Sequence, residues 1–155
     1  MAAAGEALGF RISQDACRAS VDGTRAALWL GPDERLVLGP ETLNVEIAGA
    51  VEQALRDLPH SLVDVSHRQT ALEVRGPQAD TVLNAGCPLD LDLQAFPIGM
   101  CTRTVLAKAE IVLWRTSADT FHIEVWRSFA AYVSRFLAAA ADDTAFSAVA
   151  PAPAP

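Results

Sequence analysis

The stretch from Leu62 to Pro77 constrains the fold most, because two short apolar runs are joined there by a polar turn. Residues 62–67 and 70–75 alternate apolar and polar side chains, a pattern typical of half-buried strands. Gly76-Pro77 follows directly, and proline is favoured at the first position of a helix. The stretch therefore predicts two strands that lead into a short helix, which Gly86 and Pro88 end.

The same local signals predict the elements on either side. Alternation and turn residues predict earlier strands at residues 8–13, 26–30 and 35–38, and later strands at residues 100–107, 110–115 and 121–126. One apolar stripe predicts a helix over residues 43–57, and a clearer stripe begins at Phe129 after the N-cap Ser128. The order βββ-α-ββ-α-βββ-α is typical of an α+β fold with antiparallel sheets and about three helices.

The length and the ends of the chain predict one domain. A chain of 155 residues fits a single domain, which we expect over residues 8–140. Residues 1–7 are expected to form a flexible N-terminus. Residues 141–155 are expected to form a disordered tail, because their alanine and proline repeats cannot build a packed core.

The charge and the cysteines exclude several classes of protein. A net charge of −7 argues against a nucleic-acid partner, which requires a dense basic face. The sequence contains no apolar run of about 18 residues and no basic N-terminal region, so neither a membrane span nor a secretory signal is expected. Three widely spaced cysteines indicate reduced thiols in the cytoplasm rather than a disulfide framework or a zinc site.

The polar residues of the sequence do not assemble into a catalytic site. Ser66 and His67 are adjacent on a predicted strand and point to opposite faces, so they cannot act as a nucleophile and its base. His60, His67 and His122 lack the spacing of metal ligands, and no phosphate-binding glycine motif occurs. Asp64 is expected to hydrogen-bond the following turn, with a catalytic carboxylate as the alternative. The sequence therefore predicts no catalytic, cofactor-binding or metal-binding residue on this chain.

Arginine and tryptophan suggest a contact with a protein partner instead. Trp126 lies out of register with Ile123 and Val125 and so faces away from them. Tryptophan and arginine are enriched where protein partners bind most strongly, and arginine suits interface ion pairs. Packing of the tryptophans in the core is the alternative. The residues predicted to contact a partner are His67, Arg68, Trp114, Arg115 and Trp126.

Two sets of motifs carry a family resemblance. The runs Val63-Asp64-Val65-Ser66-His67 and Leu72-Glu73-Val74-Arg75-Gly76-Pro77-Gln78-Ala79 resemble the glycine-cleavage T-protein and its folate-binding relatives. Five further motifs resemble the gamma subunit of heterotetrameric sarcosine oxidase: Leu28-Trp29-Leu30-Gly31-Pro32-Asp33-Glu34, Ala85-Gly86-Cys87-Pro88-Leu89-Asp90-Leu91, Cys101-Thr102-Arg103-Thr104, Ala109-Glu110-Ile111-Val112-Leu113-Trp114-Arg115 and Arg127-Ser128-Phe129.

The resemblance implies part of the T-protein fold and a small subunit without an active site of its own. The implied complex demethylates sarcosine to glycine oxidatively, with peroxide and formaldehyde or methylene-tetrahydrofolate as further products. Its FAD, FMN, NAD and tetrahydrofolate would lie on other subunits, and the partners of this chain would be the alpha, beta and delta subunits. T-proteins carry an acidic residue just after the second helix, whereas this chain has Asn84-Ala85-Gly86-Cys87-Pro88 there, so folate chemistry is not expected.

Two alternative functions stay open from the sequence. The first is a free-standing folate-binding or one-carbon-transfer protein that kept a pocket of the fold. The second is an interaction module unrelated to amine oxidation. Binding of tetrahydrofolate by the isolated chain would favour the first alternative over a subunit of sarcosine oxidase.

Overall fold

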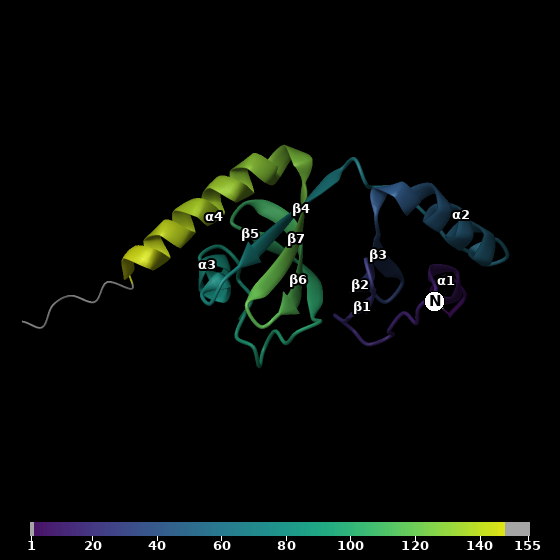
Figure 1. Ribbon diagram of the computed structural model, residues 1–155, viewed down its shortest axis with the longest axis horizontal. Coiled ribbons are helices and arrows are strands. Elements are labelled where there is room, and N and C mark those ends of the chain that lie inside the picture. Colours follow the sequence, from purple (N-terminus) through teal and green to yellow (C-terminus); the bar gives the residue numbers. More distant parts are fainter. Residues whose placement is uncertain (1, 148–155) are drawn as a thin grey trace, which may run out of the picture. The chain divides into compact units, whose positions relative to one another are not determined.

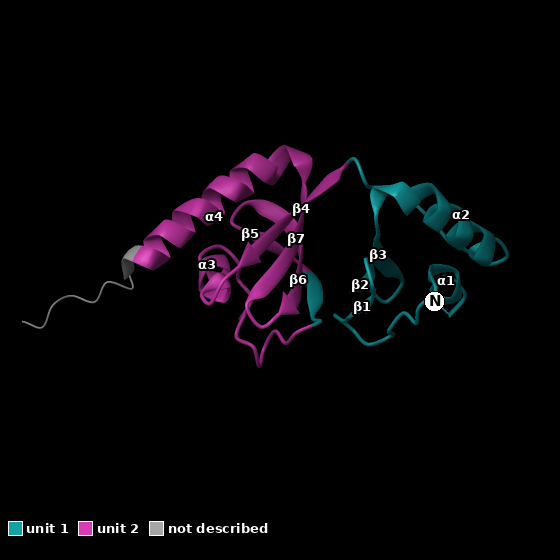
Figure 2. Cartoon of the chain, in the orientation of Figure 1, with its two compact units in different colours: residues 1–67, 99–102 teal, residues 68–98, 103–155 magenta. Residues whose placement is uncertain are grey.

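Residues 2–147 are described by a computed structural model and divide into two units (Figure 2). Unit 1 comprises residues up to 67 together with residues 99–102, and unit 2 comprises residues 68–98 and those from 103 onward. The single domain over residues 8–140 stays a prediction, because a unit defined by contacts need not fold independently. Among residues 2–147, no helix combines the length and apolar character needed to cross a bilayer.

Unit 1 combines a small antiparallel sheet with two helices (Figure 1). Its strands pair in the order β1-β2-β3. The bounds of its elements are α1 Ala2–Leu8, β1 Ala19–Asp22, β2 Arg25–Gly31, β3 Glu34–Leu38, the 3₁₀ turn η1 Glu41–Leu43 and α2 Asn44–Leu55. The hairpin of β2 and β3 and the helix α2 lie where the sequence predicts them, because their signals are local.

The N-terminus differs from the prediction. Residues 2–8 form α1 where a flexible segment was expected, and residues 8–13 form no strand. Ala4 and Leu8, one helical turn apart, are 7% and 1% exposed and belong to a core cluster with Ile12 and Val51 of α2. The alternation of Leu8 and Ile12 therefore reflects burial against α2 rather than strand pairing.

The segment at residues 62–67 is also not a strand. Residues 61–65 have no regular structure, and residues 66–68 form a turn. Val63 is 70% exposed, and no described strand pairs with the segment to bury it. The expected role of Asp64 is confirmed, since its carboxylate accepts a hydrogen bond from the Ser66 amide at 2.9 Å. Hydrogen bonds from Ser66 and from the Asn44 amide lower the pKa of Asp64 below its ordinary value.

Unit 2 is built on a second antiparallel sheet whose strand order is β4-β7-β6-β5. Its elements are β4 Gln69–Arg75, α3 Ala79–Asn84, β5 Cys101–Leu106, β6 Ala109–Ser117, β7 Thr120–Trp126 and α4 Arg127–Ser147, with the first two residues of β5 grouped in unit 1. α4 packs on α3, β4 and β7 (Figure 1). The two sheets and the helices confirm the α+β class, and among residues 2–147 α1 is the one α-helix that the sequence did not predict.

The core of unit 2 lies on one face of this sheet. The strand registers place Leu113 and Leu72 opposite Ile123, so all three share a face. Leu113, Ile123 and Val133 of α4 are fully buried. The sheet therefore buries one row of alternating side chains, as period-2 patterning predicts for a sheet covered by helices.

Gly86 lets α4 pack closely on the turn after α3. A Cβ atom at this position would lie 2.6 Å from Cζ of Phe136 and 3.0 Å from the Ala107 amide nitrogen. The Gly86 carbonyl accepts a hydrogen bond from that amide at 2.9 Å. Gly86 follows the C-cap residue Ala85 of α3, as the sequence predicted, and its lack of a side chain also serves this close packing.

α4 is longer than predicted. It continues to Ser147, so residues 141–147 are helical where a disordered tail was expected. Alanine is a strong helix former, and the Ala138-Ala139-Ala140-Ala141 run favours this continuation. The rest of the predicted tail, residues 148–155, lies outside the described residues.

Candidate partner-contact surface

The second face of the unit 2 sheet carries two of the five predicted contact residues, Trp114 and Trp126. Trp114 lies opposite His122 in the β6–β7 pairing, and Trp126 ends β7 on the same side. This side is opposite to that of Ile123 and Val125, which are fully buried. The register prediction for Trp126 is therefore confirmed, and its side chain is 39% exposed.

A histidine–carboxylate pair occupies the middle of this face. His122 Nε2 lies 2.7 Å from Glu124 Oε1, and the Trp114 ring lies 5.7 Å from the imidazole centroid to centroid. Glu124 is only 7% exposed, and a carboxylate removed from water needs a hydrogen-bonding partner. His122 supplies this partner, so the pair stabilises the fold of the sheet face.

Arg68 and Trp126 form a stacked pair at the end of the sheet. The guanidinium carbon of Arg68 lies 4.3 Å from the centroid of the Trp126 ring, a distance suited to a cation–π interaction. The Arg127 amide donates a hydrogen bond to the Arg68 carbonyl at 3.0 Å. This bond ties the turn before β4 to the first residue of α4, so Arg68, Trp126 and Arg127 are held together.

The other predicted contact residues lie in different surroundings. Arg115 is 2% exposed and donates hydrogen bonds to the carbonyls of Leu91 and Phe96 at 2.8 and 3.0 Å. Its side chain therefore organises the loop at residues 89–98 inside unit 2 rather than lying on the surface. His67 is exposed in the turn of residues 66–68 at the end of unit 1.

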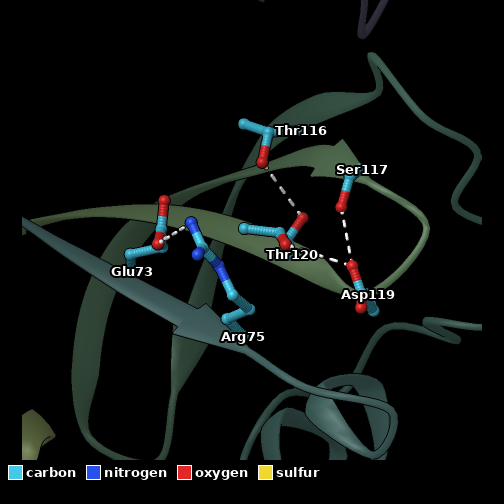
Figure 3. Close-up of polar contacts among 6 residues, drawn as sticks. All are labelled: Glu73, Arg75, Thr116, Ser117, Asp119 and Thr120. Atoms are coloured by element: carbon cyan, nitrogen blue, oxygen red, sulfur yellow. Dashed lines mark hydrogen bonds and ion pairs between the residues drawn. The ribbon is translucent and has the colours of Figure 1, made fainter.

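The far end of the β6–β7 hairpin is held by a separate polar cluster (Figure 3). The hydroxyls of Ser117 and Thr120 donate hydrogen bonds to Asp119 Oδ1 at 2.8 and 3.2 Å. These two bonds lower the pKa of Asp119 below its ordinary value. Nearby, Arg75 and Glu73 form an exposed ion pair at 2.8 Å on β4. The cluster stabilises the turn between β6 and β7, and the Asp119 carboxylate accepts the hydrogen bonds that hold this turn.

The cysteines and the possible metal ligands are the other candidate reactive groups. Burial raises the pKa of the Cys101 thiol to about 11, so this cysteine stays protonated at neutral pH and is a poor nucleophile. Within the described part of the chain, no three histidine, cysteine, aspartate or glutamate side chains gather closely enough to bind a metal ion.

A cavity of about 470 Å³ lies in unit 2 between β4, α3 and α4, and it is lined mainly by apolar residues such as Leu72, Val82 and Leu137.

The sequence did not predict that two aromatic residues of α4 are exposed on the surface. Phe129 and Tyr132 were placed in the apolar stripe of the last helix, yet they are 39% and 38% exposed. Their rings meet edge to face with centroids 6.4 Å apart. Both residues lie in the first two turns of α4, before the buried Val133. This position at the start of the helix is the local signal that could have distinguished them from core residues.

Comparison with known proteins relates the chain to one family. The family model described as "Sarcosine oxidase, gamma subunit family" matches residues 1–143. The chain is 38% identical over 151 residues to a sarcosine oxidase subunit gamma of Corynebacterium sp. (strain P-1), covering 96% of this chain and 73% of that one. It is also 38% identical over 104 residues to a subunit gamma from Arthrobacter sp., covering 67% of this chain and 50% of that one.

The structure has a solved counterpart as well. It matches a chain of the heterotetrameric sarcosine oxidase from Corynebacterium sp. U-96, which was solved in complex with pyrrole 2-carboxylate. The TM-score is 0.84 at 31% sequence identity, over 92% of this chain and 72% of that chain.

Proposed function

Because this chain belongs to the sarcosine oxidase gamma subunit family, we propose that it is the gamma subunit of a heterotetrameric sarcosine oxidase. The structural match to a chain of such a complex carries this proposal, since it extends over 92% of the chain at a TM-score of 0.84. The complex would demethylate sarcosine oxidatively to glycine, with peroxide and formaldehyde or methylene-tetrahydrofolate as the other products.

The role of this chain would be to bind the larger subunits. The partners are the alpha, beta and delta subunits, in the cytoplasm, and FAD, FMN, NAD and tetrahydrofolate would be held by those other subunits. Three carboxylates and one thiol that are held in structural contacts support this division of work. Asp64 and Asp119 are held by turn hydrogen bonds, Glu124 is paired with His122, and burial keeps the Cys101 thiol protonated.

The predicted contact residues support the same role to different degrees. Arg68 and Trp126 form an exposed stacked pair, and His67 is exposed beside Arg68 in the sequence. Trp114 lies on the same sheet face but is partly buried, and Arg115 is buried. We therefore place the contact with a larger subunit at Arg68 and Trp126 rather than at Arg115.

Activity and folate binding of the isolated chain test this function. The purified full-length chain, shown to be folded by circular dichroism, is expected to form no peroxide from sarcosine, because the redox cofactors lie elsewhere. Titration with tetrahydrofolate is expected to leave the tryptophan fluorescence without a saturable change. The complex purified with the larger subunits serves as the positive control for peroxide formation. Micromolar folate binding by the isolated chain would contradict the proposal and indicate a free-standing folate-binding protein.

A further inference from the structure

Three exposed aromatic side chains follow one another where β7 passes directly into α4. Trp126, Phe129 and Tyr132 are 39%, 39% and 38% exposed. Each lies three residues from the next, so the Cα atoms of neighbours are at most about 10 Å apart. The rings of Phe129 and Tyr132 are in contact, with centroids 6.4 Å apart, and Trp126 precedes them at the end of β7. Exposed apolar patches on a folded surface are typical of a binding site for another macromolecule. We call these three residues, with Arg68, Arg127 and Arg135, the junction surface.

The charge of the junction surface is opposite to that of the chain. Arg68 stacks on Trp126, its carbonyl is hydrogen-bonded to the Arg127 amide, and Arg135 follows Tyr132 by one turn of α4. From Arg127 to Ala141 the helix carries no carboxylate. Three arginines therefore gather around the aromatic residues of a chain whose net charge is −7.

The arrangement of Arg68 suits recognition of a carboxylate. The guanidinium carbon lies 4.3 Å from the centroid of the indole, and a guanidinium that lies flat on an aromatic ring keeps its N–H groups at the edge for hydrogen bonds in its own plane. Arginine binds a carboxylate through two parallel hydrogen bonds in that plane. The net negative charge of the chain disfavours an anionic membrane or a nucleic acid, both of which present dense negative charge over a wide area.

We propose that the junction surface binds an acidic segment of a larger sarcosine oxidase subunit, with Trp126, Phe129 and Tyr132 as apolar anchors and the arginines as partners for its carboxylates. This inference rests on the proposed function and names the surface and the partner chemistry. Aromatic anchors surrounded by arginine have the composition of strong protein–protein contacts. Attraction between opposite charges speeds such association and weakens as salt screens it.

The co-expressed complex allows a direct test. Trp126→Ala is expected to raise the dissociation constant of this chain from the larger subunits by about thirtyfold, as for a strong anchor residue. The triple variant R68E/R127E/R135E is expected to raise it by about a hundredfold or more at low salt and to invert the salt dependence of the wild type, because salt would then screen repulsion instead of attraction. Surface plasmon resonance against the immobilised larger subunits at several salt concentrations measures both effects.

Matched controls are taken from unit 1, at an exposed position of α2 and at its C-cap residue Arg56. Val45 is 86% exposed and Arg56 is also on the surface. Val45→Ala and R56E are expected to leave the dissociation constant unchanged, and thermal melting shows whether each variant is folded. Folded junction variants that bind like the wild type would overturn this inference while leaving the proposed function intact. A wild-type chain that does not bind the larger subunits would instead contradict the proposed function.

Discussion

Replacing Arg115 with alanine is expected to lower the free energy of unfolding by about 3–5 kcal/mol, because two buried carbonyls lose their donors at about 1–3 kcal/mol each and packing is lost as well. The guanidinium donates to the carbonyls of Leu91 and Phe96, whose residues are 0% and 1% exposed. It also donates to the Ala118 carbonyl and lies 4.7 Å over the ring of Phe121. One side chain thus joins the loop of residues 89–98 to the β6–β7 hairpin.

Urea denaturation followed by circular dichroism measures this effect. Arg75→Ala is the matched control, since Arg75 forms an exposed ion pair with Glu73 and such pairs contribute at most about 1 kcal/mol. Arg115→Lys keeps the charge but cannot reach several carbonyls at once, so an intermediate loss is expected. Equal stability of Arg115→Ala and Arg75→Ala would contradict a structural role for Arg115.

His122→Ala is expected to lower the free energy of unfolding by about 2–4 kcal/mol. Leaving a buried polar group without its hydrogen-bond partner costs about 1–3 kcal/mol, and more when that group is charged, while the His122 side chain, 24% exposed, lets some water reach the site. The cause is Glu124, whose carboxylate would stay buried without its partner at 2.7 Å. The double variant His122→Ala/Glu124→Ala is therefore expected to lose less stability than the two single variants together.

A second histidine–glutamate pair in the chain provides the control. His60 Nε2 lies 3.2 Å from Glu52 Oε2 in unit 1, and the Glu52 side chain is 62% exposed. Since water can solvate the Glu52 carboxylate when the histidine is removed, His60→Ala is expected to have a much smaller effect at the same pH. Unfolding in urea at neutral pH compares all four variants. If both histidine substitutions change stability equally, burial of Glu124 does not set the importance of its pair.

The local patterns of the sequence predicted the sheet of unit 2 well. β4, β6 and β7 and the start of α4 lie within about two residues of their expected positions, because alternation and helical stripes are local properties. The segment at residues 62–67 shows the limit of this reasoning. Its alternation matches that of β4, but a strand also requires a neighbouring strand, which only the whole fold determines.

The contact residues show a similar limit. Arginine is seldom buried, so the sequence placed Arg115 on a surface. Its burial depends on carbonyls of a loop about twenty residues earlier in the chain, and no local pattern reports them. Phe129 and Tyr132 show the opposite case, since helical spacing placed them in the core and the structure exposes them. Which residues can contact a partner depends on which side chains the tertiary structure buries, and local patterns do not report this. The family resemblance, by contrast, was evident from the order of short motifs along the chain.

The mass of the species that contains this chain tests the central claim most directly. The affinity-tagged chain is co-expressed with alpha, beta and delta subunits of a sarcosine oxidase and separated by size exclusion with light scattering. We expect the chain to elute in a single species whose mass equals the sum of one copy of each of the four subunits. Elution of the tagged chain as a monomer, of 16.5 kDa plus the mass of the tag, with the larger subunits assembled in a separate peak, would contradict its role as a gamma subunit.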